Sequence, residues 1–373
     1  MKKKVLHITG AMNVGGTETM LVNLYRKIND RVTFDFISYS DVEAYYDKEI
    51  EHLGGKIIRL KPPKEIGFVS SINNLKKVIK ENGPYDVVHT HMLFNSSIGM
   101  ISAYLAGIKI RVSHAHTTQD YSKGIFRKFY IKFMRILIRM FSTNFLACSE
   151  KAGKYLFGND ISGKSNYEIL PNYIDYNKFL KIKDKNYLKK ELNINKDFSL
   201  ICHIGRFIDL KNHDFLIDVF KDMLNINNKL KLILVGTGDN EEFIKNKVRN
   251  LNIEDSVYFL GIRNDIPNIL SSVDLFVLPS IVEGLGLVLL EAQASSIHCL
   301  VSEAIQPEVD LGINLLYKLN LDNGSVAWAE KAIKILKSNK KNDLDVMTAF
   351  KERGYDLTSI LNKLSKIYKI NLY

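Results

Sequence analysis

Several residue types are scarce in this chain, and their scarcity excludes whole classes of protein. The 373 residues include only 3 Cys, 7 Pro and 1 Trp. Lys, Arg or Glu interrupts every apolar run before it reaches the roughly 18 residues that a membrane-spanning helix requires, so we expect no transmembrane helix. Cys148, Cys202 and Cys299 lie far apart in apolar segments. This spacing argues against a disulfide framework or a zinc site and favours buried thiols in a reducing cytoplasm.

The first ten residues do not have the pattern that is typical of a signal peptide. Three lysines follow Met1, but the apolar stretch behind them ends at Gly10. A secretory signal needs a longer apolar region, so we expect a first β-strand here instead.

Acidic residues are outnumbered, which points to an anionic partner. The net charge is +11, from 52 Lys and Arg against 41 Asp and Glu. Nucleic acid, an anionic membrane surface and phosphorylated small molecules are all compatible with this excess. Because Lys and Asn are abundant throughout, part of the excess can also reflect overall composition.

Short β-rich runs alternate with helical stretches along nearly the whole chain. This alternation predicts parallel sheets covered by helices. The first set of expected strands covers residues 4–9, 32–38, 56–60, 86–91, 110–116 and 144–149. The second set covers residues 200–206, 231–236, 257–261, 275–279 and 298–302.

The two sets of strands predict two doubly wound, Rossmann-like α/β domains that face a central cleft. A stretch rich in Asn, Lys and Asp separates them after Pro171-Asn172. We expect domains at residues 1–172 and 173–353, followed by a last helix, 357–368, within a C-terminal segment at residues 354–373. In open α/β sheets, ligands bind beyond the carboxyl ends of the strands, so the loops after the strands are the candidate sites.

Two features of the first half lie after expected strands. Gly15 and Gly16 precede a helix, where glycine lets a phosphate or sugar approach the backbone, although a simple tight turn explains them equally. The sequences His89-Thr90-His91 and His114-Ala115-His116 end two further strands. No matching carboxylate or cysteine set accompanies these histidines, so we expect acid/base or polar contacts, or mere loop ordering, rather than a metal site.

Cations and glycines follow the strands of the second half. Gly205 and Arg206 end one strand and Lys211 follows, an arrangement suited to a diphosphate, although solvated surface charges are the alternative. Further along, the segment from Glu283 to Glu291 reads EGLGLVLLE. A carboxylate at Glu291 in so apolar a segment needs a partner, and sugar hydroxyls are suitable ones.

The ordered set of these motifs resembles the retaining glycosyltransferases of family 4. The Glu-x7-Glu motif of that family matches Glu283 to Glu291. Its surroundings match in order as well, over nearly the whole chain: Gly15-Gly16-Thr17-Glu18, Pro171-Asn172, Ile204-Gly205-Arg206 with Lys211, Val235-Gly236-Thr237-Gly238, and Asp274 to Ser280. Within the family, the tract after Glu283 and the segment 299–303 are most similar to transferases that build exopolysaccharide and capsule.

The resemblance implies a GT-B fold whose two domains bind different substrates. The first domain would bind the acceptor, the second would bind the nucleotide sugar, and the last helix would pack back on the first domain. Arg206 and Lys211 would neutralise the leaving diphosphate, Glu291 would hold the ribose, and His116 or His114 would contact the sugar, with His116 standing where the family places its histidine. The other donor-binding positions would be Gly15, Gly16, Gly205, Gly261, Ile262, Glu283, Gly284, Leu285, Gly286 and Leu287.

The resemblance further implies a retaining reaction without a metal or other cofactor. The donor would be a nucleotide sugar, UDP-linked rather than GDP-linked, carrying a hexose or an N-acetylhexosamine. The acceptor would be a glycan or a polyprenyl-diphosphate-linked sugar, in exopolysaccharide, capsule or other surface-polysaccharide synthesis. An alternative is a nucleotide-sugar epimerase of the same fold. A nucleic-acid-binding module is disfavoured, because its cations should form a continuous stripe with aromatic residues.

Residues 123–139 combine six cations with large apolar residues at helical spacing. A basic amphipathic helix of this kind can lie on an anionic membrane. The alternative is an ordinary helix that turns its apolar stripe to the core. We therefore expect a cytoplasmic protein that can be peripheral on the inner face of the cell membrane.

Overall fold

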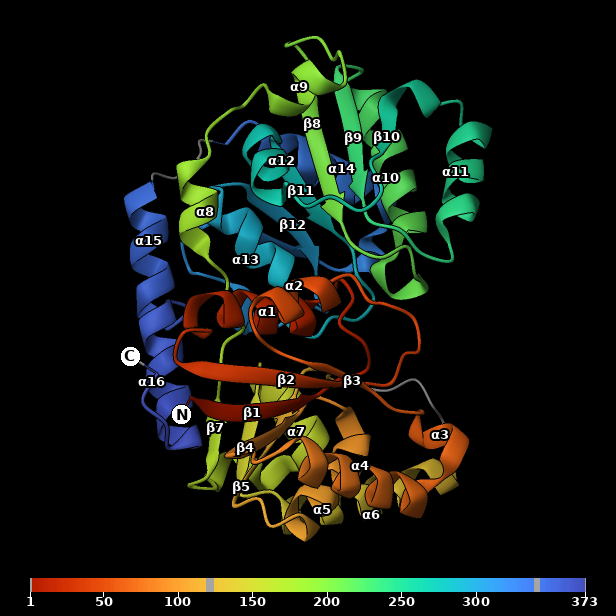
Figure 1. Cartoon of the computed structure of the whole chain (residues 1–373). Coiled ribbons are helices and arrows are strands. Elements are labelled where there is room, and N and C mark those ends of the chain that lie inside the picture. The colour runs from red at the N-terminus through yellow and green to blue at the C-terminus, as the bar shows by residue number, and fades with distance from the viewer. Residues whose placement is uncertain (1, 119–123, 339–342, 373) are drawn as a thin grey trace. The chain divides into compact units, whose positions relative to one another are not determined.

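The computed structural model describes residues 2–118, 124–338 and 343–372. Its internal contacts divide the chain into two units, which are shown in Figure 1. The first unit contains Met1–Tyr173 and Gly354–Tyr373, and the second contains Ile174–Arg353. No helix among the described residues combines the length and the apolar character needed to cross a bilayer.

The first unit contains a seven-stranded parallel sheet in the order β3-β2-β1-β4-β5-β6-β7. Its strands are β1 (Lys3–Ile8), β2 (Val32–Ser38), β3 (Ile57–Arg59), β4 (Val87–Thr90), β5 (Ile110–Ala115), β6 (Asn144–Ala147) and β7 (Tyr167–Ile169). Its helices are α1 (Gly16–Ile28), α2 (Asp47–His52), α3 (Pro63–Ile66), α4 (Phe68–Asn82), α5 (Ser96–Leu105), α6 (Ile125–Phe141), α7 (Glu150–Phe157) and α16 (Leu357–Tyr368), with 3-10 turns η1 (Leu93–Asn95) and η2 (Asn159–Gly163).

The second unit contains a six-stranded parallel sheet in the order β10-β9-β8-β11-β12-β13. Its strands are β8 (Ser199–Ile204), β9 (Leu230–Val235), β10 (Val257–Phe259), β11 (Leu275–Leu278), β12 (His298–Ser302) and β13 (Leu316–Leu319). Its helices are α8 (Tyr176–Lys181), α9 (Tyr187–Glu191), α10 (His213–Ile226), α11 (Glu241–Asn250), α12 (Ile266–Ser272), α13 (Leu287–Ala294), α14 (Gly324–Leu336) and α15 (Asp343–Glu352), with 3-10 turns η3 (Asp209–Lys211), η4 (Glu254–Ser256), η5 (Pro307–Val309) and η6 (Leu321–Asn323).

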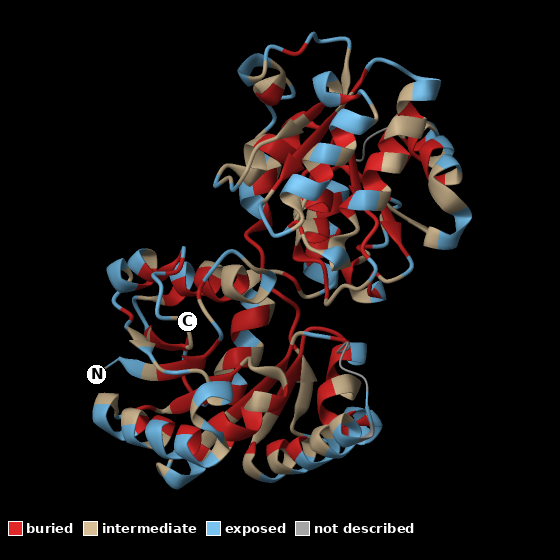
Figure 2. Ribbon diagram, turned by 90° about the vertical axis from the view of Figure 1, so that its right-hand side faces the viewer, coloured by how far each residue is buried: buried red, intermediate tan, exposed pale blue. Residues whose placement is uncertain are grey.

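Helices cover both faces of each sheet, which explains the nearly continuous apolar strands. In β11 all four residues, LFVL, are buried. Figure 2 shows the strands of each unit mostly buried and the outer faces of the helices exposed. Strands buried on both faces lose the alternation of polar and apolar residues that marks a half-exposed strand.

The C-terminal helix α16 belongs to the core of the first unit. Ile360, Leu361 and Leu364 are buried in one apolar cluster with Val5 and Tyr25. The Tyr368 hydroxyl lies 2.6 Å from Nδ1 of His89. The chain therefore returns to its first sheet after it has formed the second unit.

The strand order places two switch points where ligand sites are expected. In each sheet the direction of winding reverses at one strand pair, β1/β4 in the first unit and β8/β11 in the second. The loops that leave such a pair diverge to opposite faces and open a crevice at the carboxyl ends. The loops after β8 and β11 carry Arg206, Lys211 and Glu283.

Candidate functional site

A basic residue and an acidic residue meet at the switch point of the second sheet. The Lys211 ammonium, from the loop after β8, forms an ion pair with the carboxylate of Glu283, from the loop after β11. Both side chains are largely buried, with 17% and 14% exposed, and the Ser280 hydroxyl donates to Glu283 at 3.3 Å. The Ile281 amide also donates to the Leu210 carbonyl at 2.9 Å. The two loops therefore form one connected platform.

Arg206 is the second cation of this platform. Its side chain is exposed, and among the described residues it has no hydrogen-bond or ion-pair partner. A guanidinium can bind two oxygens of a phosphate in a fork. Arg206 is therefore available to an anionic ligand, and the ion pair with Glu283 holds Lys211 in place while leaving it further N–H groups to donate.

Two glycines after β9 let this loop approach the platform closely. A Cβ atom at Gly236 would lie 2.2 Å from the Gly205 carbonyl oxygen, and one at Gly238 would lie 2.5 Å from the Phe207 carbonyl oxygen. Gly236 also has a φ of +130°. These positions need glycine for steric reasons, which accounts for the Val-Gly-Thr-Gly motif in the sequence.

Helix α13 begins at the glycine-rich turn that follows Glu283. Gly286 occupies the left-handed region at φ 81° and ψ 59° and caps the helix, and Leu285 and Leu287 are buried. The amides of a first helical turn have no acceptor within the helix, so they attract negative or electronegative ligand groups.

Glu291 lies on α13 and is the second carboxylate of the motif. It is partly exposed, but surrounding protein atoms raise the pKa of its carboxyl to about 8. Within the described part of the chain this carboxyl has no hydrogen-bond or ion-pair partner. An unpaired carboxyl among apolar residues is suited to accept hydrogen bonds from hydroxyl groups of a ligand.

The raised pKa of Glu291 predicts a pH-dependent difference in stability. Between its ordinary value of 4.5 and about 8, the folded protein holds a proton on Glu291 that the unfolded chain releases. Stability must therefore fall as pH rises through this range. We expect Glu291→Gln to remove this loss and to stabilise the protein at pH 9 by on the order of 2 kcal/mol, allowing for partial exposure. Urea unfolding of both proteins at pH 5 and pH 9 measures this effect. If the free energies of unfolding of the two proteins differ by the same amount at both pH values, the carboxyl is not buried as described.

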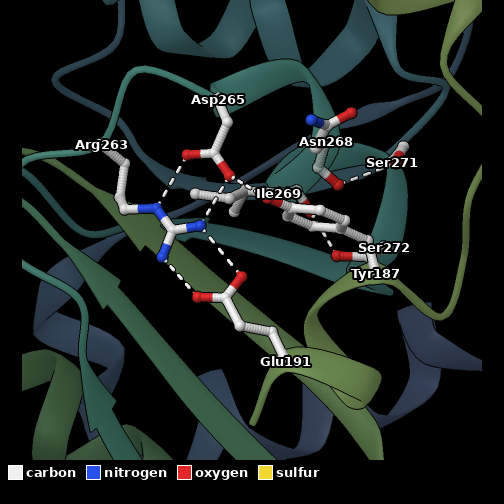
Figure 3. Close-up of polar contacts among 8 residues, drawn as sticks. All are labelled: Tyr187, Glu191, Arg263, Asp265, Asn268, Ile269, Ser271 and Ser272. Carbon is white, nitrogen blue, oxygen red and sulfur yellow. Dashed lines mark hydrogen bonds and ion pairs between the residues drawn. The ribbon is translucent and has the colours of Figure 1, made fainter.

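A network of charged residues holds the loop between β10 and α12 (Figure 3). The guanidinium of Arg263 contacts the carboxylates of Asp265, at 2.8 and 2.6 Å, and Glu191, at 2.6 and 3.0 Å. The Tyr187 hydroxyl donates to Asp265 at 2.7 Å. Arg263 lowers the pKa of the Asp265 carboxyl to about 2. The network joins α9 to the loop that carries Ile262.

Gly261 and Ile262 form the accessible end of this loop. The Gly236 amide donates to the Gly261 carbonyl at 2.8 Å, so the loops after β9 and β10 are joined. The Ile262 side chain is 53% exposed. An exposed apolar side chain on a fixed loop is a suitable contact for a planar base.

The first unit holds the remaining candidates, Gly15, Gly16 and His116. A Cβ atom at Gly16 would meet nothing within 4 Å, and one at Gly15 would meet only the flexible carboxylate of Glu18. Neither glycine is therefore required by its protein neighbours. Burial lowers the pKa of His116 to about 3, so its imidazole is neutral at pH 7.

The structure also adds a histidine that the sequence analysis did not single out. His7 on β1 pairs in register with His89 on β4, and its Nδ1 lies 3.1 Å from Nε2 of His91. The available signal was its position near the end of the first strand. His7, His89, His91, His114 and His116 form one group, which we call the histidine cluster.

Comparison with known proteins agrees with the resemblance seen in the sequence. Residues 14–178 match the family model described as Glycosyltransferase Family 4, and residues 184–355 match Glycosyl transferases group 1. EpsF of Bacillus subtilis, named as a glycosyltransferase, is 34% identical over 99% of this chain and 97% of its own. The capsular polysaccharide biosynthesis glycosyltransferase CapH of Staphylococcus aureus is 28% identical, with 98% of each chain covered.

A solved structure shows the same fold. Anabaena HepE, crystallised with UDP and glucose, has a TM-score of 0.79 and 18% identity, with 98% of this chain and 99% of that chain covered. Two parallel α/β units of this kind constitute the GT-B fold. The chain therefore belongs to glycosyltransferase family 4, and it is a glycosyltransferase with a GT-B fold.

Proposed function

We propose that this chain transfers a hexose or an N-acetylhexosamine from a UDP-sugar to a glycan or lipid-linked acceptor, with retention of anomeric configuration and without a metal. The observation that carries the proposal is the platform at the β8/β11 switch point. There Arg206 has no hydrogen-bond or ion-pair partner in the described part of the chain, Lys211 is fixed by Glu283, and Glu291 lies on the helix that follows. The GT-B structure of HepE with UDP-glucose supports a UDP-linked donor.

Each platform residue has a distinct task in this proposal. Arg206 and Lys211 neutralise the diphosphate as the bond from the anomeric carbon to the phosphate oxygen breaks. Fixed cations aimed at developing charge are an effective electrostatic catalyst. Glu291 accepts hydrogen bonds from the ribose, while Glu283 and the backbone of residues 284–287 hold the sugar. Gly205, Gly261 and Ile262 line the nucleotide, and Gly15, Gly16 and His116 of the first unit contact the donor.

The acceptor attacks from the face that the diphosphate leaves. Its oxygen forms the new bond to the anomeric carbon, and its proton passes to the departing phosphate oxygen. No protein base is needed, and the configuration is retained. Proton NMR of the isolated product tests this step, because an α-linked donor must give an α-linked product. A β-linked product overturns retention.

The acceptor proposal draws on the relatives' names. One Escherichia coli relative, 27% identical over 80% of this chain, is named as a UDP-Gal:alpha-D-GlcNAc-diphosphoundecaprenol alpha-1,3-galactosyltransferase. With EpsF and CapH, it favours a role in exopolysaccharide, capsule or other surface-glycan synthesis. Analysis of the products distinguishes a transferase from the alternative, an epimerase. An epimerase converts the sugar of the donor, whereas a transferase moves the sugar to an acceptor.

Helix α6 supports a membrane location for this reaction. Five large apolar side chains on α6 are between 48% and 87% exposed: Phe126, Phe129, Phe133, Ile136 and Met140. Their spacing places them along one stripe of the helix, while Met134 and Ile138 face the core. The apolar residues of α6 are therefore not simply its core face. Lys123, the first residue of the expected basic segment, lies outside the described residues.

The charges of α6 match an anionic surface. Its sequence contains no acidic residue, and Lys128 and Lys132 are exposed. Arg135 and Arg139 are held by the Tyr155 carbonyl at 2.7 Å and Asp160 at 2.7 Å. Exposed aromatic residues flanked by lysines are typical of helices that lie in the headgroup region. We propose that α6 binds the inner face of the cell membrane.

Vesicle binding tests the role of α6. We expect the protein to sediment with phosphatidylglycerol vesicles more strongly than with phosphatidylcholine vesicles, and less at high salt. Replacing Phe129 and Phe133 together by Ser should weaken binding roughly tenfold, because two partly inserted rings are lost. Val69→Ser is the control, since Val69 is 68% exposed on α4. Equal losses in both variants, or no preference for anionic vesicles, would argue against this surface.

A further inference from the structure

The histidine cluster gathers side chains from three adjacent strands on one face of the first sheet. His7 lies on β1, His89 on β4 and His114 on β5, while His91 and His116 follow β4 and β5 directly. Residues two apart on a strand point to the same face. Neighbouring ring centroids are accordingly 4.0 Å apart for His114 and His116 and 4.3 Å apart for His89 and His91.

A chain of close nitrogens runs through the cluster. Nδ1 of His91 lies 2.8 Å from Nε2 of His116, and Nε2 of His91 lies 3.1 Å from Nδ1 of His7. His91 is thus held at both ring nitrogens. A neutral imidazole has one N–H and one lone pair. If the Nε2 proton of His91 is donated to His7, its Nδ1 lone pair points toward His116.

Several buried ring nitrogens of the cluster have no hydrogen-bond partner among the described residues. Both nitrogens of His114 are in this state, as are Nε2 of His7, Nε2 of His89 and Nδ1 of His116. Buried polar atoms are nearly always paired, so a concentration of exceptions at one place indicates a bound species. The atoms without a partner are all imidazole nitrogens. The bound species is therefore one that imidazole can bind.

Three imidazoles in this cluster lie within reach of one ion. Single ligand nitrogens of His91, His114 and His116 all lie within 4.8 Å of one another. Nitrogens bound tetrahedrally to zinc at 2.0–2.1 Å are about 3.4 Å apart, so small rotations of the rings would close the site. A second possible set, His7, His89 and His91, is more deeply buried. The first set is favoured because it contains a second half-buried histidine, His116, beside His91 and is therefore more accessible to the ion.

We propose that His91, His114 and His116 form a three-histidine site for a borderline transition-metal ion, Zn²⁺ above all, with His7 orienting His91 from outside the ligand set. Imidazole suits Zn²⁺, Cu²⁺ and Ni²⁺, whereas Mg²⁺ and Ca²⁺ prefer oxygen ligands. Three histidines leave a fourth position open to water or to another ligand. A metal-bound histidine commonly donates its second N–H to a fixed partner, as His91 can to His7.

The proposal differs from the expectation that the histidines would not form a metal site. That expectation counted only the two His-x-His pairs and required an additional carboxylate or cysteine. Strands β4 and β5 are neighbours in the sheet, so the two pairs lie together and supply three imidazole ligands by themselves, with His7 beside them. The metal takes no part in the proposed transfer. Because that transfer also assigns His116 to the donor, a zinc ion and the donor sugar would compete for this side chain.

Cobalt binding tests the site directly on the full chain without an affinity tag. After chelator treatment, we expect Co²⁺ to bind at about one ion per chain, to give the visible absorption of tetrahedral nitrogen coordination, and to be displaced by Zn²⁺. His91→Gln should weaken Co²⁺ binding by at least 10- to 100-fold. His52→Ala is the matched control, because His52 is exposed on α2 and lies outside the cluster.

Two results would overturn the site. One is wild-type protein that binds no Co²⁺ with this spectrum, which would leave ordered water as the partner of the orphaned nitrogens. The other is equal Co²⁺ affinity in His91→Gln and wild type. The wild-type titration does not depend on whether a variant folds. For His91→Gln, circular dichroism checks that the variant is folded.

Discussion

Replacing Arg206 by alanine should lower kcat for sugar transfer by roughly 100- to 1,000-fold, the usual effect of removing one preorganised group that stabilises developing charge. Arg206 is exposed and has no hydrogen-bond or ion-pair partner among the described residues, so its removal breaks no such interaction there. The free energy of unfolding should accordingly change by no more than about 0.5 kcal/mol. Steady-state kinetics with the active donor measures the first effect, and urea unfolding measures the second.

Arg249→Ala is the matched control for this experiment. Arg249 is an exposed arginine of the same unit, but it lies on helix α11 with Glu242 3.8 Å away. Its removal changes the net charge equally without touching the platform. If both variants lose activity to the same extent, Arg206 acts only through overall charge and its assigned role is wrong.

Replacing Gly236 by alanine should destabilise the second unit by roughly 4 kcal/mol, among the larger effects of a single substitution. The added Cβ would lie 2.2 Å from the Gly205 carbonyl oxygen, a backbone atom that cannot rotate away. The loops after β8 and β9 must then separate, which displaces Arg206 as well. We expect a lower thermal midpoint together with weaker UDP binding.

Gly324→Ala separates the steric clash from the cost of backbone conformation. Gly324 also has a positive φ, +77°, but a Cβ there would meet nothing within 4 Å. This variant should lose only about 1–3 kcal/mol, the cost of a side chain at a backbone conformation (φ 77°, ψ 167°) that is populated almost only by glycine. Similar losses at the two positions would mean that the loops after β8 and β9 are not packed as described.

Much of the fold follows from local sequence, since every expected strand has a counterpart within two residues at each end. Helix α16 has the expected bounds of 357–368. Strands β7 and β13 were not predicted, because they are only three and four residues long and every residue is half-buried. Edge strands of this kind carry neither an apolar run nor a clear alternation. Helices α8 and α9 likewise lie in the stretch that the sequence presented as a polar connection.

The candidate site was predictable where its residues lie in one loop or one helix. The motif of Glu283 and Glu291 identifies α13 and its glycine turn from the sequence alone. The ion pair of Lys211 with Glu283 joins residues 72 positions apart, so it depends on strand order rather than on spacing. The ion pair of Arg263 with Glu191 also joins residues 72 positions apart, so it too could not be read from spacing. Periodicity predicts elements, whereas these contacts arise only when the strands assemble.

The central claim is that this chain holds a nucleotide sugar on the platform after β8 and β11 and releases the nucleotide on transfer. The most direct test is nucleotide release by the purified protein across a panel of UDP- and GDP-sugars, with membrane extract as acceptor and no added metal. We predict release from one UDP-sugar, lost in Arg206→Ala. Absence of both release and nucleotide binding across the whole panel would contradict the claim.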